Sequence, residues 1–120
     1  MNALIINKAT VKDSVLDGLA QELPVIIANV MEVPGGNVAL VKPENVSLEF
    51  SQASPRDVGS DIRISIFARK NAPRSSTEKE LAKEILDGVL ALVSTFKEKY
   101  SVDIRLYLMD IAAAEHTPEA

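Results

Sequence analysis

The chain has 120 residues, of which 47% are hydrophobic and 25% charged, and its formal net charge is −4. This length and composition predict one globular domain with a single core, and they exclude a disordered chain. The acidic balance argues against nucleic acid as a partner, because neutralising phosphates requires a basic surface. The sequence has no cysteine, which excludes disulfides and mildly favours a reducing compartment.

Residues 1–7 contain no basic segment and too short an apolar run for a signal peptide. We find no apolar run of 18 residues anywhere in the sequence. We therefore expect a soluble, cytoplasmic protein that has no membrane partner.

The first half of the chain predicts a strand and a helix. Residues 3–8 are apolar on both faces, which predicts a central strand. Residues 13–32 keep helical spacing on both sides of Pro24, so we expect a single helix that is kinked there. Residues 33–37 contain Pro and paired Gly and predict a loop. Residues 38–41 are either a brief edge strand or a packed loop.

The second half predicts three strands and a helix. Residues 45–51, 61–69 and 102–111 alternate apolar and polar side chains, as strands with one buried face do. Between the last two strands, Ser75 with Glu78, or Thr77 with Glu80, has capping-box spacing. An apolar stripe then continues to Phe96 and predicts a long helix.

These elements predict a single α+β domain over residues 1–111, followed by a tail at 112–120 that frays or lies on a neighbour. The order β-α-β-β-α-β consists of two β-α-β units. Because such units are right-handed, both helices lie on one face of a four-stranded sheet, which makes a two-layer sandwich.

The other face of the sheet is polar but carries Phe67, Tyr107 and Met109 among its charges. Two interpretations remain open for this face. It is either solvated or packed against other subunits, with its charges paired across the interface.

The element order resembles that of the tautomerase superfamily. Residues 67–78, with the sequence FARKNAPRSSTE, are similar in layout to the strand, turn and helix start of its carboxymethyl-hydroxymuconate isomerase-like members, which are related to 4-oxalocrotonate tautomerase. The resemblance implies a homotrimer with the helices outside. It also implies a pocket at the start of the first strand, where an amino-terminal proline acts as general base on a small carbonyl or enol substrate.

The sequence departs from the family at this position, because Asn2 follows Met1 where the family has its proline. Since Asn2 is not small, we expect the initiator methionine to remain. The α-amine of Met1 is then either a base or nucleophile in a pocket, or a free and solvated N-terminus.

Substrate contacts carry over only in part. The family's arginine after the first strand falls on Lys12, which keeps the charge without the bidentate fork. A second family arginine falls near Ser47, which carries no charge. If the first and third strands are antiparallel neighbours, Arg69 lies near Asn2, where it either binds an anion or forms a surface salt bridge. We interpret Arg56, Lys70 and Arg74 as solvated loop charges.

Two classes of function remain. The first is a tautomerase-like enzyme with altered or lost proline chemistry, and the second is a noncatalytic oligomeric or ligand-binding domain with the same fold. The single histidine, His116, lies in the tail, so we expect neither a metal site nor a cofactor. A monomeric module that binds nucleic acid is disfavoured by the charge.

Overall fold

The structure is a computed structural model that describes residues 1–32 and 41–119. The predicted loop at 33–37 and most of the possible strand at 38–41 lie outside the described residues. The elements are, in chain order, β1 (Asn2–Asn7), α1 (Asp13–Met31), the 3-10 turn η1 (Pro43–Asn45), β2 (Ser47–Gln52), β3 (Ile62–Arg69), α2 (Ala72–Ser76), α3 (Glu78–Ser94) and β4 (Val102–Met109).

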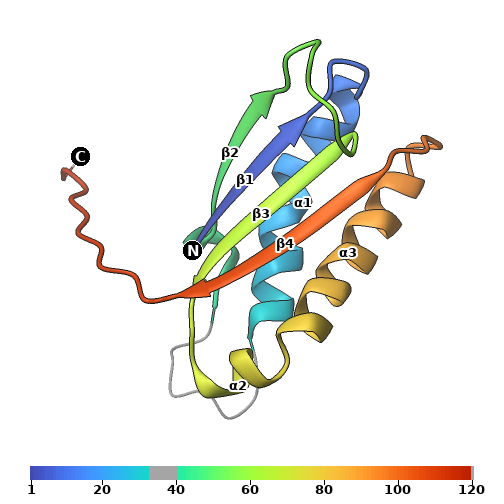
Figure 1. Ribbon diagram of the computed structural model, residues 1–120. Coiled ribbons are helices and arrows are strands. Elements are labelled where there is room, and N and C mark those ends of the chain that lie inside the picture. The colour runs from blue at the N-terminus through green and yellow to red at the C-terminus, as the bar shows by residue number, and fades with distance from the viewer. Residues whose placement is uncertain (33–40, 120) are drawn as a thin grey trace.

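The four strands form one mixed sheet in the order β2-β1-β3-β4. Strand β1 runs parallel to β2 and antiparallel to β3, and β3 runs parallel to β4. The long helices α1 and α3 lie together on one side of this sheet (Figure 1). The predicted α+β architecture of two β-α-β units is therefore confirmed, as is the central position of β1.

The core lies between the sheet and the two long helices. In β3 every second side chain is buried, beginning with Ile62, as the alternation predicts. Helix α1 contributes a buried stripe at three- and four-residue spacing, and α3 contributes a second one. The two helices approach closely at Gly88, where an added Cβ would lie 2.9 Å from Cγ2 of Ile26.

Helix α1 continues through Pro24, so the prediction of one helix is confirmed. Our expectation that no apolar run is long enough to span a membrane was wrong for this segment. Among the described residues, α1 is one helix whose length and composition would permit a span. Leu19, Leu23 and Ile27 of this helix are fully buried in the domain's own core, whereas Val25 is 38% exposed.

The predicted buried row of the second strand is only partly correct. Val46 is buried, but Leu48 is half-buried and Phe50 is 38% exposed. Strand β2 is an edge strand, and Figure 1 shows α1 behind the middle of the sheet. The helix layer therefore shields this edge incompletely.

Neither predicted capping box forms at the start of the second long helix. The chain first makes the short helix α2, whose N-cap Asn71 accepts a hydrogen bond from the backbone N–H of Arg74 at 2.9 Å. Thr77 then precedes α3 without capping it, because its hydroxyl donates to the carbonyl oxygen of Pro73 at 2.8 Å. Helix α3 ends at Ser94, before Phe96.

Arg74 is a buried residue and not the solvated loop charge that we expected, since its exposed fraction is 5%. Its Nη1 donates to the carbonyl oxygen of Arg69 at 2.9 Å. Its Nε and Nη2 donate to the carbonyl oxygen of Met31 at 3.4 and 3.3 Å. Burial lowers the pKa of this guanidinium. Arg74 thus joins the last turn of α1 to the end of β3.

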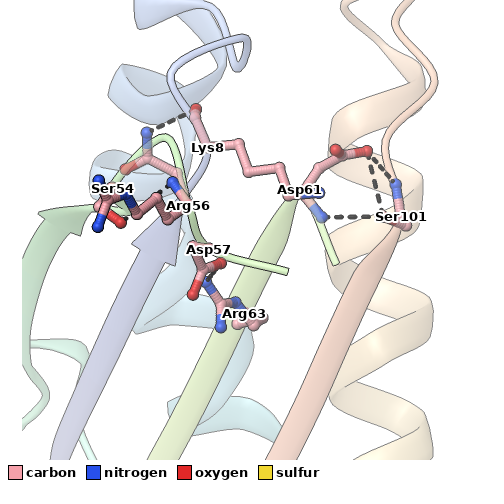
Figure 2. A network of polar contacts seen from close by, with 8 residues as sticks. Lys8, Ser54, Arg56, Asp57, Asp61, Arg63 and Ser101 are labelled. Atoms are coloured by element: carbon pink, nitrogen blue, oxygen red, sulfur yellow. Dashed lines mark hydrogen bonds and ion pairs between the residues drawn. The ribbon is translucent and has the colours of Figure 1, made fainter. Parts of the chain in front are cut away.

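The opposite end of the sheet is held by a separate polar network (Figure 2). The carboxylate of Asp61 accepts hydrogen bonds from the backbone N–H and the hydroxyl of Ser101, at 2.9 and 3.1 Å. The backbone N–H of Lys8 donates to the carbonyl oxygen of Asp61 at 2.9 Å. Arg63 on β3 pairs with Asp57 in the preceding loop. The network connects β1, β3 and β4.

After β4 the chain has no regular structure. Residues 112–119 are exposed, and the tail points away from the domain (Figure 1). The strand ends at Met109, two residues before the predicted boundary. The boundary of the domain at residue 111 stays a prediction.

Candidate functional site

The sheet face opposite the helices, which we call the open face, is built from residues that pair across all four strands. Asn2 pairs with Ser47 on one side and with Phe67 on the other, and Phe67 pairs with Tyr107. The rings of Phe67 and Tyr107 are stacked, with their centroids 5.1 Å apart and their planes 10° from parallel. Glu49 and Leu4 pair in the next row of this face.

A pocket of about 460 Å³ lies where this row crosses the start of β1. Three strands contribute to it, because β1 is central and brings the starts of β1 and β2 beside the end of β3. Its lining residues are Asn2, Ala3, Leu4, Ser47, Leu48, Glu49 and Phe67.

The lining offers few polar side chains, each with a distinct capacity. The amide of Asn2 and the hydroxyl of Ser47 can each donate a hydrogen bond. Glu49 is the single ionisable side chain of the lining, and it is exposed to solvent. The pocket therefore presents two neutral donors and one carboxylate, and among the described residues no cationic side chain lines it.

Comparison with protein families and with curated proteins gave no match. Solved structures do match over nearly the whole chain. A fused 4-OT that is an asymmetric trimer has a TM-score of 0.67 at 12% identity, covering 98% of this chain and 95% of its own. A fused 4-OT that is a symmetric trimer has a TM-score of 0.65 at 11% identity, covering 98% and 94%. This chain has the fold of the tautomerase superfamily.

The same fold occurs in a malonate semialdehyde decarboxylase inhibited by 3-bromopropiolate. It matches with a TM-score of 0.62 at 10% identity and covers 90% of this chain and 82% of its own. At these identities the likeness concerns the path of the backbone. Which side chains do chemistry has to be judged from this chain's own pocket.

Two of the site residues that the sequence suggested line the pocket of this tautomerase fold, namely Asn2 and Ser47. Met1 lies next to them but outside the lining. Its α-amine donates a hydrogen bond to the carbonyl oxygen of Asn45 in the turn η1, at 3.2 Å. Met1 thus directs its α-amine toward the backbone of the turn η1.

Arg69 lies on the open face, at the next outward-facing position of β3 after Phe67. One residue, Ala68, separates it from Phe67 along β3, it pairs with Met109 of β4, and its side chain is exposed. It does not line the pocket.

Lys12 lies beyond the C-terminal end of β1, directly before α1, whereas the pocket is at the N-terminal end of β1. Its ammonium forms an ion pair with Glu98, and its backbone N–H donates to the hydroxyl of Tyr100 at 3.2 Å. The hydrogen bond from Glu98 and its negative charge raise the pKa of Lys12. The structure therefore does not bring Lys12 together with Asn2 and Ser47.

Two further arginines of the open face are neutralised within the chain. Arg63 pairs with Asp57, as Figure 2 shows, and Nε of Arg105 lies 3.2 Å from the carboxylate of Asp103. The hydrogen bond and the charge of Asp103 raise the pKa of Arg105, and Tyr107 adds to the shift. These arginines are part of local ion pairs outside the pocket lining.

The sequence analysis missed two residues of the pocket, Glu49 and Phe67. The sequence analysis does not single out Glu49, and it places Phe67 on the polar face of the sheet without a pocket. The pairing of Glu49 with Leu4 and of Phe67 with Asn2 supplies the missing signal. Within the described residues, no group of three or more His, Cys, Asp or Glu side chains could hold a metal ion.

Proposed function

We propose that this protein is a tautomerase-like enzyme that moves a proton on a small carbonyl or enol compound, in the pocket at the start of β1. The observation that carries this proposal is the lining itself, in which the carboxylate of Glu49 shares one pocket with the amide of Asn2 and the hydroxyl of Ser47. One group can take a proton, and the other two can bind an oxygen atom.

The reaction needs only these groups. The carboxylate of Glu49 takes a proton from the carbon next to the substrate carbonyl, and the electron pair of that C–H bond moves to form the enolate. Hydrogen bonds from Asn2 and Ser47 stabilise the charge that develops on the oxygen. Return of the proton from Glu49 to that oxygen gives the enol, and the reverse sequence gives the ketone.

Glu49 is a better base in this geometry than the α-amine of Met1. The amine is directed to the carbonyl oxygen of Asn45 and lies outside the pocket lining, whereas Glu49 lies within it. Asn2 occupies the position of the family's proline and contributes a side-chain amide in place of a secondary amine.

We also propose that the protein is a homotrimer that buries part of the open face. The solved fused 4-OT structures that share its fold are trimers. The open face carries Ile6, Tyr107 and Met109, which are 36%, 39% and 37% exposed in the single chain. Sedimentation should give three times the 13.0 kDa of one chain, and a monomer at micromolar concentration would contradict this proposal. The cytoplasmic location stays a prediction.

A noncatalytic ligand-binding domain is the second candidate. The position of Met1 favours it, because the amine that would replace the family's catalytic nitrogen hydrogen bonds to Asn45. Both candidates use the same pocket, and they differ only in whether Glu49 transfers a proton.

An assay of enol decay separates the two candidates. The substrates are phenylenolpyruvate and its methyl ester, and the loss of enol absorbance is followed with wild type, Glu49→Gln and Glu98→Gln. We expect Glu49→Gln to lower kcat/KM by about 10²-fold or more, the usual contribution of a general base. Glu98→Gln is the matched control, since Glu98 pairs with Lys12 at the far end of β1. Turnover that is equal in wild type and Glu49→Gln would refute the proposal.

A further inference from the structure

The charge of the pocket lining and the ring of Phe67 indicate which class of ligand the pocket binds. We infer that this pocket selects a planar aromatic compound that is uncharged or cationic, and that it rejects carboxylates. This inference concerns the substrate class of the site proposed above and rests on the location of that site.

The charge selection follows from Glu49. It is the single charged side chain among the seven residues of the lining. Two like charges about 4 Å apart repel each other, and salt and solvent screen this repulsion in part. An anionic ligand therefore loses affinity in this pocket, and a cationic one gains it.

Four cations of the sheet and its ends are held by partners outside the pocket. Arg63 and Arg105 are held by Asp57 and Asp103, and Lys12 is held by Glu98. Arg74 donates to two backbone carbonyls on the helix side of the sheet end. Two further cations lie near the pocket but outside its lining: Arg69 is exposed on the open face beyond Phe67, and the ammonium of Met1 donates to the carbonyl oxygen of Asn45. Glu49 is thus the charged group that a ligand inside the lining meets at the shortest range.

The ring selection follows from the row Asn2, Phe67, Tyr107. Tyr107 stacks on one face of the Phe67 ring at a centroid distance of 5.1 Å. Asn2 pairs with Phe67 from the other side, which is the side of the pocket. Stacking on Tyr107 fixes the orientation of the Phe67 ring, so that a planar ligand meets a preformed aromatic wall.

Isosteric probes test the two selections separately from catalysis. Benzamidine, benzamide and benzoate have the same shape and charges of +1, 0 and −1, and acetamide lacks the ring. Binding is measured by calorimetric titration of the 120-residue chain. We expect benzamidine to bind most tightly, benzamide next, benzoate at least tenfold more weakly than benzamide, and acetamide without measurable affinity.

Variants assign the effects to residues. Glu49→Gln should bring the affinities of benzamidine and benzoate to within about twofold, and Glu98→Gln should leave their ratio unchanged. Phe67→Leu should weaken benzamide by fivefold or more. Phe50→Leu is the matched control, because Phe50 is also half-exposed but lies on the helix side of the edge strand.

Each outcome bears on one of the two proposals. Benzoate binding as tightly as benzamide, or no binding of any probe at millimolar concentration, would overturn the inferred ligand class. The expected order of affinities without any enol turnover would support the ligand class and refute the enzymatic proposal. Turnover that depends on Glu49 but favours phenylenolpyruvate over its methyl ester would support the enzyme and overturn the ligand class.

Discussion

The buried guanidinium of Arg74 makes a strong prediction about stability. Replacing Arg74 with Met keeps an apolar chain of similar length but removes the donors to the carbonyl oxygens of Met31 and Arg69. A buried carbonyl without a donor costs about 1–3 kcal/mol. The bonds to Met31 are buried and the bond to Arg69 is partly buried, so the two losses cost at most about 2–6 kcal/mol. Relief from burying a charge offsets part of this. We expect Arg74→Met to lower the free energy of unfolding by about 2–3 kcal/mol.

Urea denaturation followed by circular dichroism measures this change, at one fixed protein concentration because an oligomer's stability depends on concentration. In a domain of this size the melting temperature should fall by roughly 6–12 °C. Arg56→Met is the matched control, since Arg56 is exposed, and it should change stability by less than about 0.5 kcal/mol. Arg74→Lys should fall between the two, because lysine keeps the charge but cannot reach two carbonyls with a planar fork.

A result in which Arg74→Met is as stable as Arg56→Met would refute this reasoning. It would mean that the two carbonyl oxygens find other donors, or that the free energy of burying the charge equals the stabilisation by its hydrogen bonds. An unchanged urea dependence of the unfolding free energy would show that the variant loses stability without losing compactness.

Two further predictions concern the helices and a surface ion pair. Gly88→Ala should lower the melting temperature, because the new Cβ would lie 2.9 Å from Cγ2 of Ile26 and overpacking costs about 1–3 kcal/mol. This cost outweighs the preference of helices for alanine, which is about 1 kcal/mol. A higher melting temperature would show that α1 and α3 move apart at little cost in free energy. Glu98 raises the folded-state pKa of Lys12 above 10.5, so the stabilisation by this pair is complete below pH 10.5 and is lost as pH rises through the folded-state pKa. The difference in melting temperature between wild type and Lys12→Met should be constant from about pH 8 to 10 and shrink above that range, and a difference that grows at high pH would contradict the pairing.

The strands were predictable where local pattern and sheet position agree. Strand β3 has neighbouring strands on both sides and the helix layer behind its middle. Its alternating apolar and polar side chains are therefore alternately buried and exposed or half-buried. Strand β2 alternates equally well, yet Phe50 is exposed. Periodicity indicates which face a side chain takes, but it does not indicate how far the helix layer extends over that face.

The error at Arg74 has a different physical origin. Its neighbours in sequence are turn formers and polar residues, which favour an exposed loop. Its burial depends on the carbonyl oxygen of Met31, a residue 43 positions earlier that only the tertiary fold brings near. A nearby cause applies to Thr77, whose predicted capping bond is replaced because α2 precedes α3 in the chain and offers the carbonyl oxygen of Pro73.

The pocket was predictable in position but not in composition. The family resemblance implies a pocket at the start of the first strand, and the lining of a pocket at that place includes Asn2 and Ser47. Glu49 could not be added from the sequence, because its place depends on the register in which β1 and β2 pair. Lys12 was carried over by counting along the chain, and it lies at the opposite end of the strand, bound to Glu98.

Asn2 stands where the resemblance to the tautomerases implies a proline, and this supports the proposal that a side chain acts as the base. A proline in that position would place its own nitrogen at the start of β1, beside Ser47 and Phe67, with which Asn2 pairs. With Asn2 there, the chain's amine belongs to the preceding residue and donates to Asn45 instead. The backbone nitrogen of Asn2 is an amide, which is not a base at neutral pH. A proton transferred in this pocket therefore needs a side-chain acceptor, and among the lining residues the carboxylate of Glu49 is the group that can accept one.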